Sequence, residues 1–285
     1  FHEKLGRGLM VVLLGGILLF PLFGMANLST GLFSVDKRKV IAMPGFNARK
    51  IDKDSSNVTL FNEPLLSITF DDGRESVYSN ALPLLNKYGV KTTQYLLSGV
   101  SDDQQYLSEK QIAQFNASGH EIACHSDTHP DLTTLDTNQL TKELSHCKQT
   151  FSKYGIVNNF ASPFGHSNST TIASIKNYFL SHRNTDGDIT NGVNDKDVNT
   201  KQNLDRYNII SASIRSDTTI EELRQALDYT IKNNGWLVLT YHQIEDSSNS
   251  TFGLDPDSLD SQLSYLSSAP IKIVTMQQAL SSLGQ

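Results

Sequence analysis

The chain has 285 residues, of which 38% are hydrophobic and 19% are charged, so it contains enough apolar material for one large domain. Its formal net charge is −6, which argues against a nucleic-acid-binding surface because such a surface needs clustered Lys and Arg. The same charge suits a neutral or cationic polymer as the substrate.

An apolar segment lies near the start of the chain. Residues 9–28 contain no charged side chain, and Lys4 and Arg7 precede them. About twenty apolar residues suffice to cross a bilayer, and basic residues before a span keep that end in the cytoplasm. Gly24-Met25-Ala26 also resembles a small-x-small cleavage site. We therefore expect residues 1–28 to be a signal peptide or a retained membrane anchor, and the rest of the chain to be exported.

Residues 29–64 have a mixed composition and are predicted to form a linker, with one further strand as an option. From Leu65 onward, apolar runs alternate with amphipathic stretches. Strands are predicted at 65–70, 92–97, 121–124, 159–161, 208–214, 236–242 and 271–274. Helices are predicted at 75–88, 108–115, 138–154, 169–177, 219–233, 257–266 and 276–283. This alternation predicts one α/β domain over residues 65–285, built on a parallel sheet or barrel.

Two adjacent carboxylates, Asp71 and Asp72, follow the first of these strands and precede Gly73. Neighbouring side chains on a strand point to opposite faces. At a strand end that turns, however, both acids can line one pocket, where one binds a metal and the other accepts a proton. The alternative is an ordinary Asp-Asp-Gly turn between a strand and a helix.

Two histidines, His125 and His129, follow the predicted strand at 121–124. Two imidazoles four residues apart can bind one cation, and imidazole together with carboxylate suits zinc and similar divalent ions. Taken alone, this spacing is also typical of two surface histidines in a polar loop. The strand ends of a parallel barrel gather on one face, so the histidines are expected to meet the aspartates there, which favours a metal site.

Four motifs, in this order, resemble those of the polysaccharide deacetylases, the family 4 carbohydrate esterases that share the NodB homology domain. Thr69–Gly73 matches the motif TFDDG, and His125–His129 matches H-S/T-x-x-H. Phe160–Gly165 matches an aromatic-rich loop that ends in Pro-Tyr-Gly or Pro-Phe-Gly, and Leu237–His242 matches a late strand that ends in His. The resemblance covers the chain from about Leu65 onward and implies a distorted (β/α) barrel with about seven parallel strands.

The resemblance implies a metal-dependent deacetylase that acts on the N-acetyl groups of N-acetylglucosamine units in a cell-surface or extracellular polysaccharide. It makes Asp72, His125 and His129 the metal ligands, with Zn²⁺ as the expected ion and Co²⁺, Ni²⁺ or Fe²⁺ as alternatives. It makes Asp71 the base that takes a proton from water, and His242 the acid that protonates the leaving group.

The third motif supplies the loop Pro163-Phe164-Gly165, and the resemblance implies that the backbone N–H of Phe164 stabilises the oxyanion. The motif departs from the family pattern at Ala161, where many members carry an arginine that orients the catalytic aspartate. Arg183 is a candidate replacement from the next strand, and the alternative is an ordinary surface charge. Asp186 and Asp188 are expected to form a turn rather than to serve as the family's fourth motif.

Two alternatives stay open for the function: an acetylxylan esterase that removes O-acetyl groups, and a carbohydrate-binding barrel that has lost catalysis through Ala161. Cys124 and Cys147 fit either a disulfide, which export would permit, or two buried thiols. We expect a monomer whose partners are an acetylated polysaccharide and, through the N-terminal segment, a membrane.

Overall fold

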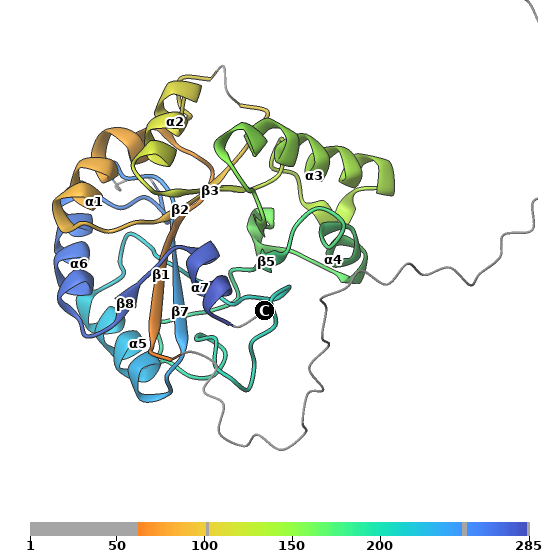
Figure 1. The fold of residues 1–285 in the computed structure, drawn as a ribbon. Helices are drawn as coiled ribbons and strands as arrows, with labels where there is room; N and C mark the ends of the chain where they lie inside the picture. Colours follow the sequence, from red (N-terminus) through yellow and green to blue (C-terminus); the bar gives the residue numbers. More distant parts are fainter. Residues whose placement is uncertain (1–61, 101–102, 247–249, 284–285) are drawn as a thin grey trace, which may run out of the picture. The chain divides into compact units, whose positions relative to one another are not determined.

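The computed structural model describes residues 62–100, 103–246 and 250–283, which form a curled parallel sheet surrounded by helices (Figure 1). The strands are β1 (Leu65–Phe70), β2 (Thr93–Leu96), β3 (Glu121–Cys124), β4 (Asn159–Ala161), β5 (Ser181–Arg183), β6 (Ala212–Ser213), β7 (Trp236–Tyr241) and β8 (Lys272–Ile273). The sheet runs in the order β5-β4-β3-β2-β1-β7-β6, all pairs are parallel, and β8 pairs with β1. The expected α/β barrel with about seven parallel strands is confirmed.

The predicted N-terminal segment over residues 1–28, and nearly all of the predicted linker, lie outside the described residues. None of the helices in the described ranges combines the length and the apolar character that crossing a bilayer requires.

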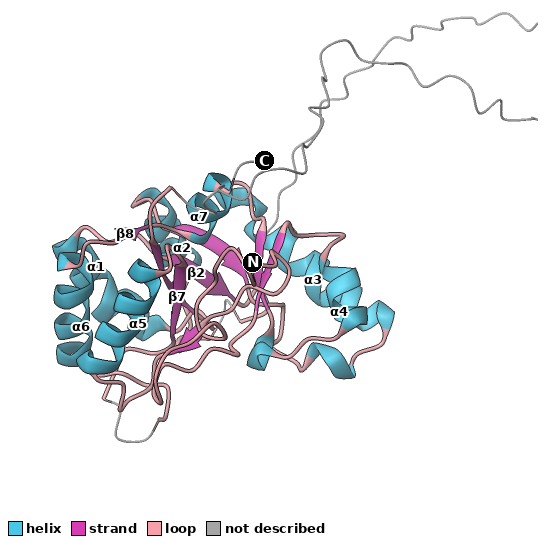
Figure 2. Ribbon diagram, turned by 90° about the horizontal axis from the view of Figure 1, so that it is seen from below, coloured by secondary structure: helices cyan, strands magenta, loops and turns pink. Residues whose placement is uncertain are grey.

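The helices are α1 (Leu82–Tyr88), α2 (Glu109–Ala117), α3 (Thr137–Phe151), α4 (Ser169–Ile175), α5 (Ile220–Lys232), α6 (Pro256–Ser268) and α7 (Met276–Ser282). Helices α1, α5 and α6 lie beside one part of the curled sheet and α3 and α4 beside another (Figures 1 and 2), and all five pack against its outer face. Short polar residues begin most of them: Ser108, Thr219 and Thr275 each form a capping box with a Gln or Glu three residues later. These caps place the helix starts close to where the sequence predicts them.

The central strands β1 and β7 are buried along their whole length and separate two apolar clusters. Ile68, Phe70 and Leu239 pack between the sheet and the helices. Trp236 and Val238 point to the other face, into the barrel interior, together with Tyr95. This alternation follows from the two-residue period of a strand. It leaves a rigid frame whose strand ends carry the polar motifs.

The barrel is irregular between β5 and β6, and here the sequence prediction was wrong. The expected strand at 208–214 is reduced to Ala212–Ser213. The side chain of Asn199 binds both backbone groups of Ile210, with its amide 2.8 Å from the carbonyl oxygen and its oxygen 2.9 Å from the N–H. Those groups are therefore not available to a neighbouring strand. Isolated bridges from Arg183 to Ile209 and from Gly187 to Ala212 close the gap instead.

The helix predicted over 75–88 is present but divided. Val77–Ala81 forms a wide π-helical turn, and α1 follows from Leu82. Pro83 lies at this change because proline has no N–H to donate inside a regular helix. Gly89 ends the helix with a φ of 67°, in the left-handed conformation that glycine adopts at little cost.

Cys124 and Cys147 form a disulfide that joins the end of β3 to α3. The sequence left this pairing open, because the spacing of the two cysteines has no specific signature. The bond lies directly before His125, so it ties the strand that carries the first histidine to the helix behind it.

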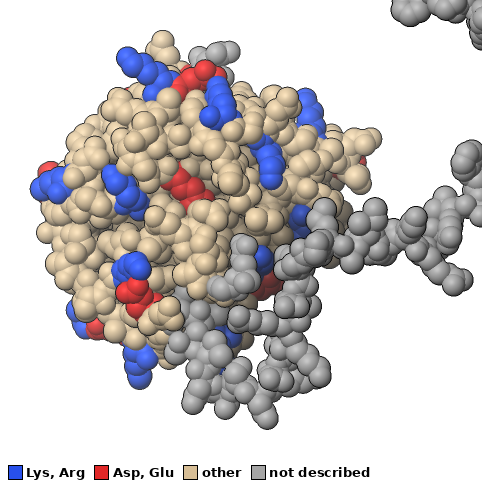
Figure 3. Space-filling model, in the orientation of Figure 1, with Lys and Arg blue, Asp and Glu red and all other residues tan. Residues whose placement is uncertain are grey.

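Lys and Arg side chains are spread over the face shown in Figure 3, several of them beside an Asp or Glu, and form no continuous basic patch there.

Candidate active site

Asp71 and Asp72 lie at the C-terminal end of β1, and both line one cavity of about 340 Å³. Asp72 has a φ of 70°, so the backbone turns into the left-handed region between the two acids. Gly73 continues the turn with a φ of 73°. The expectation that a turning strand end lets both acids face one pocket is confirmed.

Asp72, His125 and His129 form a candidate metal-binding group whose ligand atoms all lie within 4.8 Å of one another. The Nε2 atoms of His125 and His129 lie 3.6 Å and 3.4 Å from Oδ1 of Asp72. Nδ1 of His125 lies 2.8 Å from the carbonyl oxygen of Ala161. A carbonyl can only accept, so Nδ1 carries the hydrogen and Nε2 presents its lone pair to the site. These donors fit a divalent ion such as zinc.

The loop that carries both histidines is held by Glu143 on α3. The carboxylate of Glu143 accepts hydrogen bonds from the N–H groups of Asp127 and Thr128, at 2.8 and 2.9 Å, and from the Thr128 hydroxyl at 2.7 Å. Ser126 and His129 both have positive φ in this loop. The sequence analysis missed Glu143. The available signal was its position in the buried stripe of α3, beside Leu144 and in line with other apolar residues.

Arg183 is fully buried and binds Asp71 with one nitrogen, Nη2, at 2.6 and 2.5 Å from the two carboxylate oxygens. Its Nη1 donates to the Asn184 carbonyl and to Ser211 Oγ, each at 3.2 Å, and its guanidinium lies 4.8 Å from the centre of the Tyr95 ring. The alternative reading of Arg183 as a surface charge is therefore wrong.

Ala161 and Arg183 are direct register partners on the neighbouring strands β4 and β5. The guanidinium that many family members carry at the Ala161 position thus comes from the adjacent strand at the same level of the sheet. Burial raises the pKa of Asp71, but the charges of Arg183, His125 and His242 and the hydrogen bond from Arg183 outweigh burial, so the pKa is lowered. Asp71 is therefore ionised at neutral pH.

His242 follows β7 and lines the same cavity as the two aspartates. Burial lowers its pKa, although the nearby charges of Asp71 and Asp72 act in the opposite direction. Its Nδ1 is buried and has no hydrogen-bond partner among the residues that the structure describes. Asp188 accepts hydrogen bonds from the N–H and the hydroxyl of Thr190, at 2.9 and 2.6 Å, so it forms a turn as expected.

The third motif forms a tight turn over Pro163–Gly165 that borders the cavity. Phe164 has a φ of 60°, is 58% exposed, and packs its ring edge-on at 4.7 Å from the ring of His129. Gly165 has a φ of 72°, and a Cβ there would lie 2.2 Å from Oγ1 of Thr185. Only glycine allows this close approach, so the loop has one position against its neighbour.

Ser162 anchors the same loop from behind. Its hydroxyl lies 2.8 Å from Nε2 of His182, whose Nδ1 lies 2.9 Å from the carbonyl oxygen of Tyr207. Nδ1 must therefore carry the hydrogen, and Nε2 accepts from Ser162. Burial lowers the pKa of His182 to about 4, so this pair is neutral at physiological pH. The sequence analysis did not identify Ser162 or His182, whose relation depends on the pairing of β4 with β5.

Two exposed aromatic rings, Phe164 and Phe252, line the cavity. The ring of Phe252 lies 5.1 Å from that of His242, whereas Phe164 packs on His129. Phe252 comes from the segment after β7 and was not identified from the sequence, because nothing in its local pattern separates it from an ordinary loop residue. Together the two rings give the cavity apolar surface beside the charged groups.

Residues 61–181 match the family model described as Polysaccharide deacetylase. Over these residues the chain is similar to the polysaccharide deacetylase family. The match includes the first three motifs. Arg183 and His242 lie beyond it, so their placement at the site comes from the structure alone.

Two curated relatives show how far the similarity extends. A bifunctional xylanase/deacetylase of Pseudobutyrivibrio xylanivorans is 30% identical over 106 residues, which cover 37% of this chain and 17% of the relative. A peptidoglycan-N-acetylmuramic acid deacetylase of Bacillus subtilis is 36% identical over 83 residues, which cover 29% of this chain and 30% of the relative. The matched segment thus spans less than a third of each relative. Both relatives are named deacetylases, and deacetylases are hydrolases.

Solved structures share the fold. The Xyl-CE4 domain of a multidomain xylanase from the hindgut metagenome of Trinervitermes trinervoides aligns with a TM-score of 0.55 at 22% identity, covering 78% of this chain and 92% of that domain. A family 4 acetyl xylan esterase from Clostridium thermocellum, in complex with a cobalt ion, aligns with a TM-score of 0.53 at 22% identity, covering 76% and 90%. At these identities the likeness establishes the fold only.

Proposed function

We propose that the protein is a metal-dependent deacetylase that hydrolyses the N-acetyl groups of N-acetylglucosamine units in a cell-surface or extracellular polysaccharide. The observation that carries this proposal is the convergence of three kinds of group in one cavity. These are a metal-binding group, an aspartate paired with a buried arginine, and a histidine with an unpaired buried nitrogen. The match of residues 61–181 to the polysaccharide deacetylase model supports deacetylation as the reaction class.

Each residue has a role that its surroundings permit. Asp72, His125 and His129 would hold the ion, and a bound divalent ion supplies a Lewis acid that polarises a carbonyl oxygen and activates water. Asp71, kept ionised by Arg183, would accept the proton of the attacking water. His242 would then donate a proton to the departing nitrogen.

The backbone N–H of Phe164 would donate to the oxygen on which negative charge develops. Its loop has one position because Gly165 packs on Thr185 and Ser162 binds His182. A donor fixed in advance stabilises developing charge without the cost of reorganisation. The two aromatic rings beside it, Phe164 and Phe252, offer apolar surface to the carbon–hydrogen face of a sugar.

The same residues would also serve an O-acetyl ester, and a relative named xylanase/deacetylase keeps acetylxylan as the second candidate. The idea of a barrel that has lost catalysis through Ala161 is disfavoured, because Arg183 supplies the missing guanidinium to Asp71. A binding protein would need neither a base nor an acid at this place.

The site of action is part of the proposal. The apolar residues 9–28, preceded by Lys4 and Arg7, support export of the domain, followed either by release or by anchoring in the membrane. Wall and surface polymers would then be within reach of the catalytic cavity.

The proposal is tested by incubating the purified domain with a panel of acetylated glycans and measuring released acetate and the masses of the products. The panel holds N-acetylglucosamine oligomers, peptidoglycan fragments and acetylated xylan oligomers. We expect acetate from the N-acetylglucosamine substrates, its loss after treatment with a chelator, and its return when Zn²⁺ or Co²⁺ is added. Acetate from xylan alone would favour the esterase, and no acetate from any substrate would reject the proposal.

A further inference from the structure

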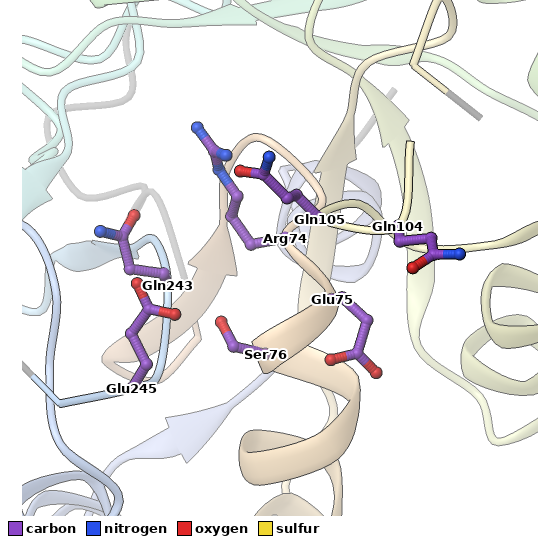
Figure 4. Close-up of a pocket in the computed structure, with 7 residues that line it drawn as sticks. All are labelled: Arg74, Glu75, Ser76, Gln104, Gln105, Gln243 and Glu245. Atoms are coloured by element: carbon purple, nitrogen blue, oxygen red, sulfur yellow. The ribbon is translucent and has the colours of Figure 1, made fainter. Parts of the chain in front are cut away.

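A second cavity lies beside the catalytic one, at the same end of the barrel. It has a volume of about 280 Å³ and is lined by residues that follow β1, precede α2 or follow β7 (Figure 4). Residues that line the second cavity lie next to residues of the catalytic one at two points. Nε of Arg74 lies 3.8 Å from Oδ2 of Asp72, and Gln243 directly follows His242. The second cavity is therefore one side chain away from the site proposed for the reaction.

The wall of this cavity after β7 is fixed in place. The Ile244 N–H donates to Ser76 Oγ at 3.2 Å, and Asn80 Nδ2 donates to the Ile244 carbonyl at 2.6 Å. The side chain of Ile244 is fully buried, and its backbone forms a parallel bridge with Leu254. A wall that is already ordered loses little freedom when a ligand binds.

Residues that follow β7 line both cavities. Gln243 and Glu245 line the second cavity, on the other side of it from Gln104 and Gln105 (Figure 4). Phe252, on the returning part of the same segment, lines the catalytic cavity. His242 and Phe252 thus line the catalytic cavity, and Gln243 and Glu245 line the second.

The lining of the second cavity is polar throughout. Gln243 donates to Ser250 Oγ at 2.8 Å, which leaves its own side-chain oxygen to accept. Gln104 and Gln105 contribute exposed amides from the opposite rim. Nε of Arg74 has no hydrogen-bond partner in the described part of the chain, and the guanidinium lies 4.6 Å above the Tyr106 ring. Donors and acceptors without apolar side chains suit a hydroxyl-rich ligand such as a pyranose.

The charges of the lining add a preference. The carboxylate of Glu75 accepts hydrogen bonds from Nε2 of Gln111 at 3.0 Å and from Oγ of Ser79 at 3.2 Å. Arg74 lies beside Asp72. Glu245 is exposed and has no ion-pair partner among the residues that the structure describes. The lining thus carries two carboxylates, Glu75 and Glu245, and one cation, Arg74. A sugar carboxylate in this cavity would meet a net negative charge, whereas an uncharged sugar would not.

We infer that this cavity is the subsite for the sugar next to the reacting unit, that it takes an uncharged pyranose, and that Glu245 excludes a sugar that carries a carboxylate. The inference rests on the proposed function, because it takes the reacting sugar to occupy the catalytic cavity. It makes Gln243 a substrate-binding residue and Glu245 a determinant of specificity.

The first test measures the binding of a neutral β-1,4-linked glucose tetramer by calorimetry. The tetramer has no acetyl group, so binding is read without turnover. Gln243→Ala removes one hydrogen-bonding group and is expected to raise Kd about five- to tenfold. The matched control is Gln225→Ala on the surface of α5, which is expected to leave Kd unchanged. An unchanged Kd for Gln243→Ala, or an equal rise in both variants, would overturn the subsite.

The second test measures the charge preference with a tetramer of the same length that contains glucuronate. Wild type is expected to bind it less tightly than the glucose tetramer. Glu245→Gln keeps the shape of the side chain and removes its charge. It should therefore reduce the ratio of the Kd for the glucuronate tetramer to the Kd for the glucose tetramer about tenfold. Glu221→Gln, on the exposed face of α5, is the control and should keep the difference. A difference that survives Glu245→Gln would overturn the role of Glu245.

Acetate release from an N-acetylglucosamine tetramer, measured on the same preparations, separates the two levels of the account. If acetate is released but the Kd values do not depend on Gln243 and Glu245, the subsite is rejected and the proposed deacetylation stands. Binding that depends on both residues, without release of acetate, would reject the proposed deacetylation and support the subsite.

Discussion

The two ends of the barrel each bury a carboxylate, and the contrast between them separates the site from the scaffold. Asp71 lies after β1 at the catalytic end, in contact with the cation Arg183. Glu121 begins β3 at the opposite end, where it accepts from the Thr93 hydroxyl at 2.9 Å, from the Gln277 N–H at 2.8 Å and from the side chain of Asn159. None of these three partners of Glu121 is charged.

The different partners shift the pKa values of the two carboxyl groups in opposite directions. Burial raises the pKa of Glu121, and its neutral hydrogen-bond donors do not overcome burial. Burial also acts on Asp71, yet its pKa is lowered because of the charges around it, Arg183 first among them. The comparison shows that burial alone favours the neutral acid. The base that we propose must be ionised and therefore needs a charged partner, and of these two carboxylates only Asp71 has one.

The two ends of the barrel also differ in their backbone conformations. Five non-glycine residues in the described part have a positive φ, and four of them lie in loops that form the catalytic cavity: Asp72, Ser126, His129 and Phe164. The opposite end is closed by α7, whose first turn donates to Glu121 and contacts Thr93. Backbone conformations with a positive φ are thus concentrated at the end of the barrel that orients the side chains of the site. The opposite end consists of regular secondary structure.

The largest expected effect comes from the metal-binding group. His125→Ala removes a ligand and should reduce the metal content of the purified protein from about one ion per chain to a small fraction of that, with loss of turnover. His166→Ala is the control, because His166 is exposed and lies outside the metal-binding group; its side chain binds Asp131, and its ring lies 5.9 Å from that of Phe164. Elemental analysis of the three proteins gives the result. Equal metal content in all three would contradict the assignment.

Asp71→Asn is expected to lower kcat at least a hundredfold and to keep the metal, because asparagine has the same shape and cannot accept the proton. The measurements are acetate release and metal content of the same preparation. Loss of the metal together with activity would show that Asp71 is a ligand, and the roles of the two aspartates would then be exchanged.

Glu143→Gln tests whether the helix behind the site positions the histidine loop. The variant replaces one of the acceptors for Asp127 and Thr128 with a donor, so the loop that carries His125 and His129 should loosen. We expect the Kd for Zn²⁺ to rise about tenfold or more, as is usual when the partner of a ligand-bearing element is removed. A chelator competition titration measures it. The control is Glu109→Gln on α2, where Glu109 is exposed and pairs with Lys153. Glu222 is unsuitable as a control because its side chain caps α5. An unchanged Kd would leave Glu143 with a structural role only.

The smallest effect is expected at the opposite end. The pKa of Glu121 is raised, so the folded state binds a proton more tightly than the unfolded state. The stability that this proton contributes is present below the ordinary glutamate pKa and is lost as pH rises through the raised value. Glu121→Gln should remove this loss and change the free energy of unfolding at neutral pH by about 1 kcal/mol or less. Denaturant titrations of both proteins at acid and neutral pH test the sign, and a variant that becomes relatively less stable with rising pH would contradict it.

The sequence predicted most of the frame and the central part of the site. Strand β4 begins and ends where expected, and the caps Ser108, Thr219 and Thr275 mark their helices, because these signals are local. The aspartate and histidine motifs were found because each follows a strand, and parallel strands bring their ends together. Short-range pattern is sufficient for such features.

What the sequence could not provide depends on pairing between distant segments. The sequence offered Arg183 as a candidate partner of Asp71 but left a surface charge as the alternative, because a strand of only three residues has no pattern that decides between them. The register of β4 against β5 decides it. The reduced strand β6 results from Asn199, whose side chain takes the backbone groups of Ile210. Glu143 and Phe252 reach the site from a helix and a returning loop, and each contact is visible only once the chain is folded.

The central claim is that Arg183 keeps Asp71 ionised as the base. The most direct test is the pH dependence of kcat for acetate release by wild type and by Arg183→Ala, with Arg215→Ala at the exposed pair with Asp217 as the control. Without the guanidinium, burial should dominate and the pKa of Asp71 should rise. The account therefore predicts that Arg183→Ala lowers kcat with little change in KM and moves the acid limb of the profile to higher pH, whereas the control matches wild type. An acid limb in Arg183→Ala that coincides with that of wild type, at an unchanged kcat, would contradict the claim.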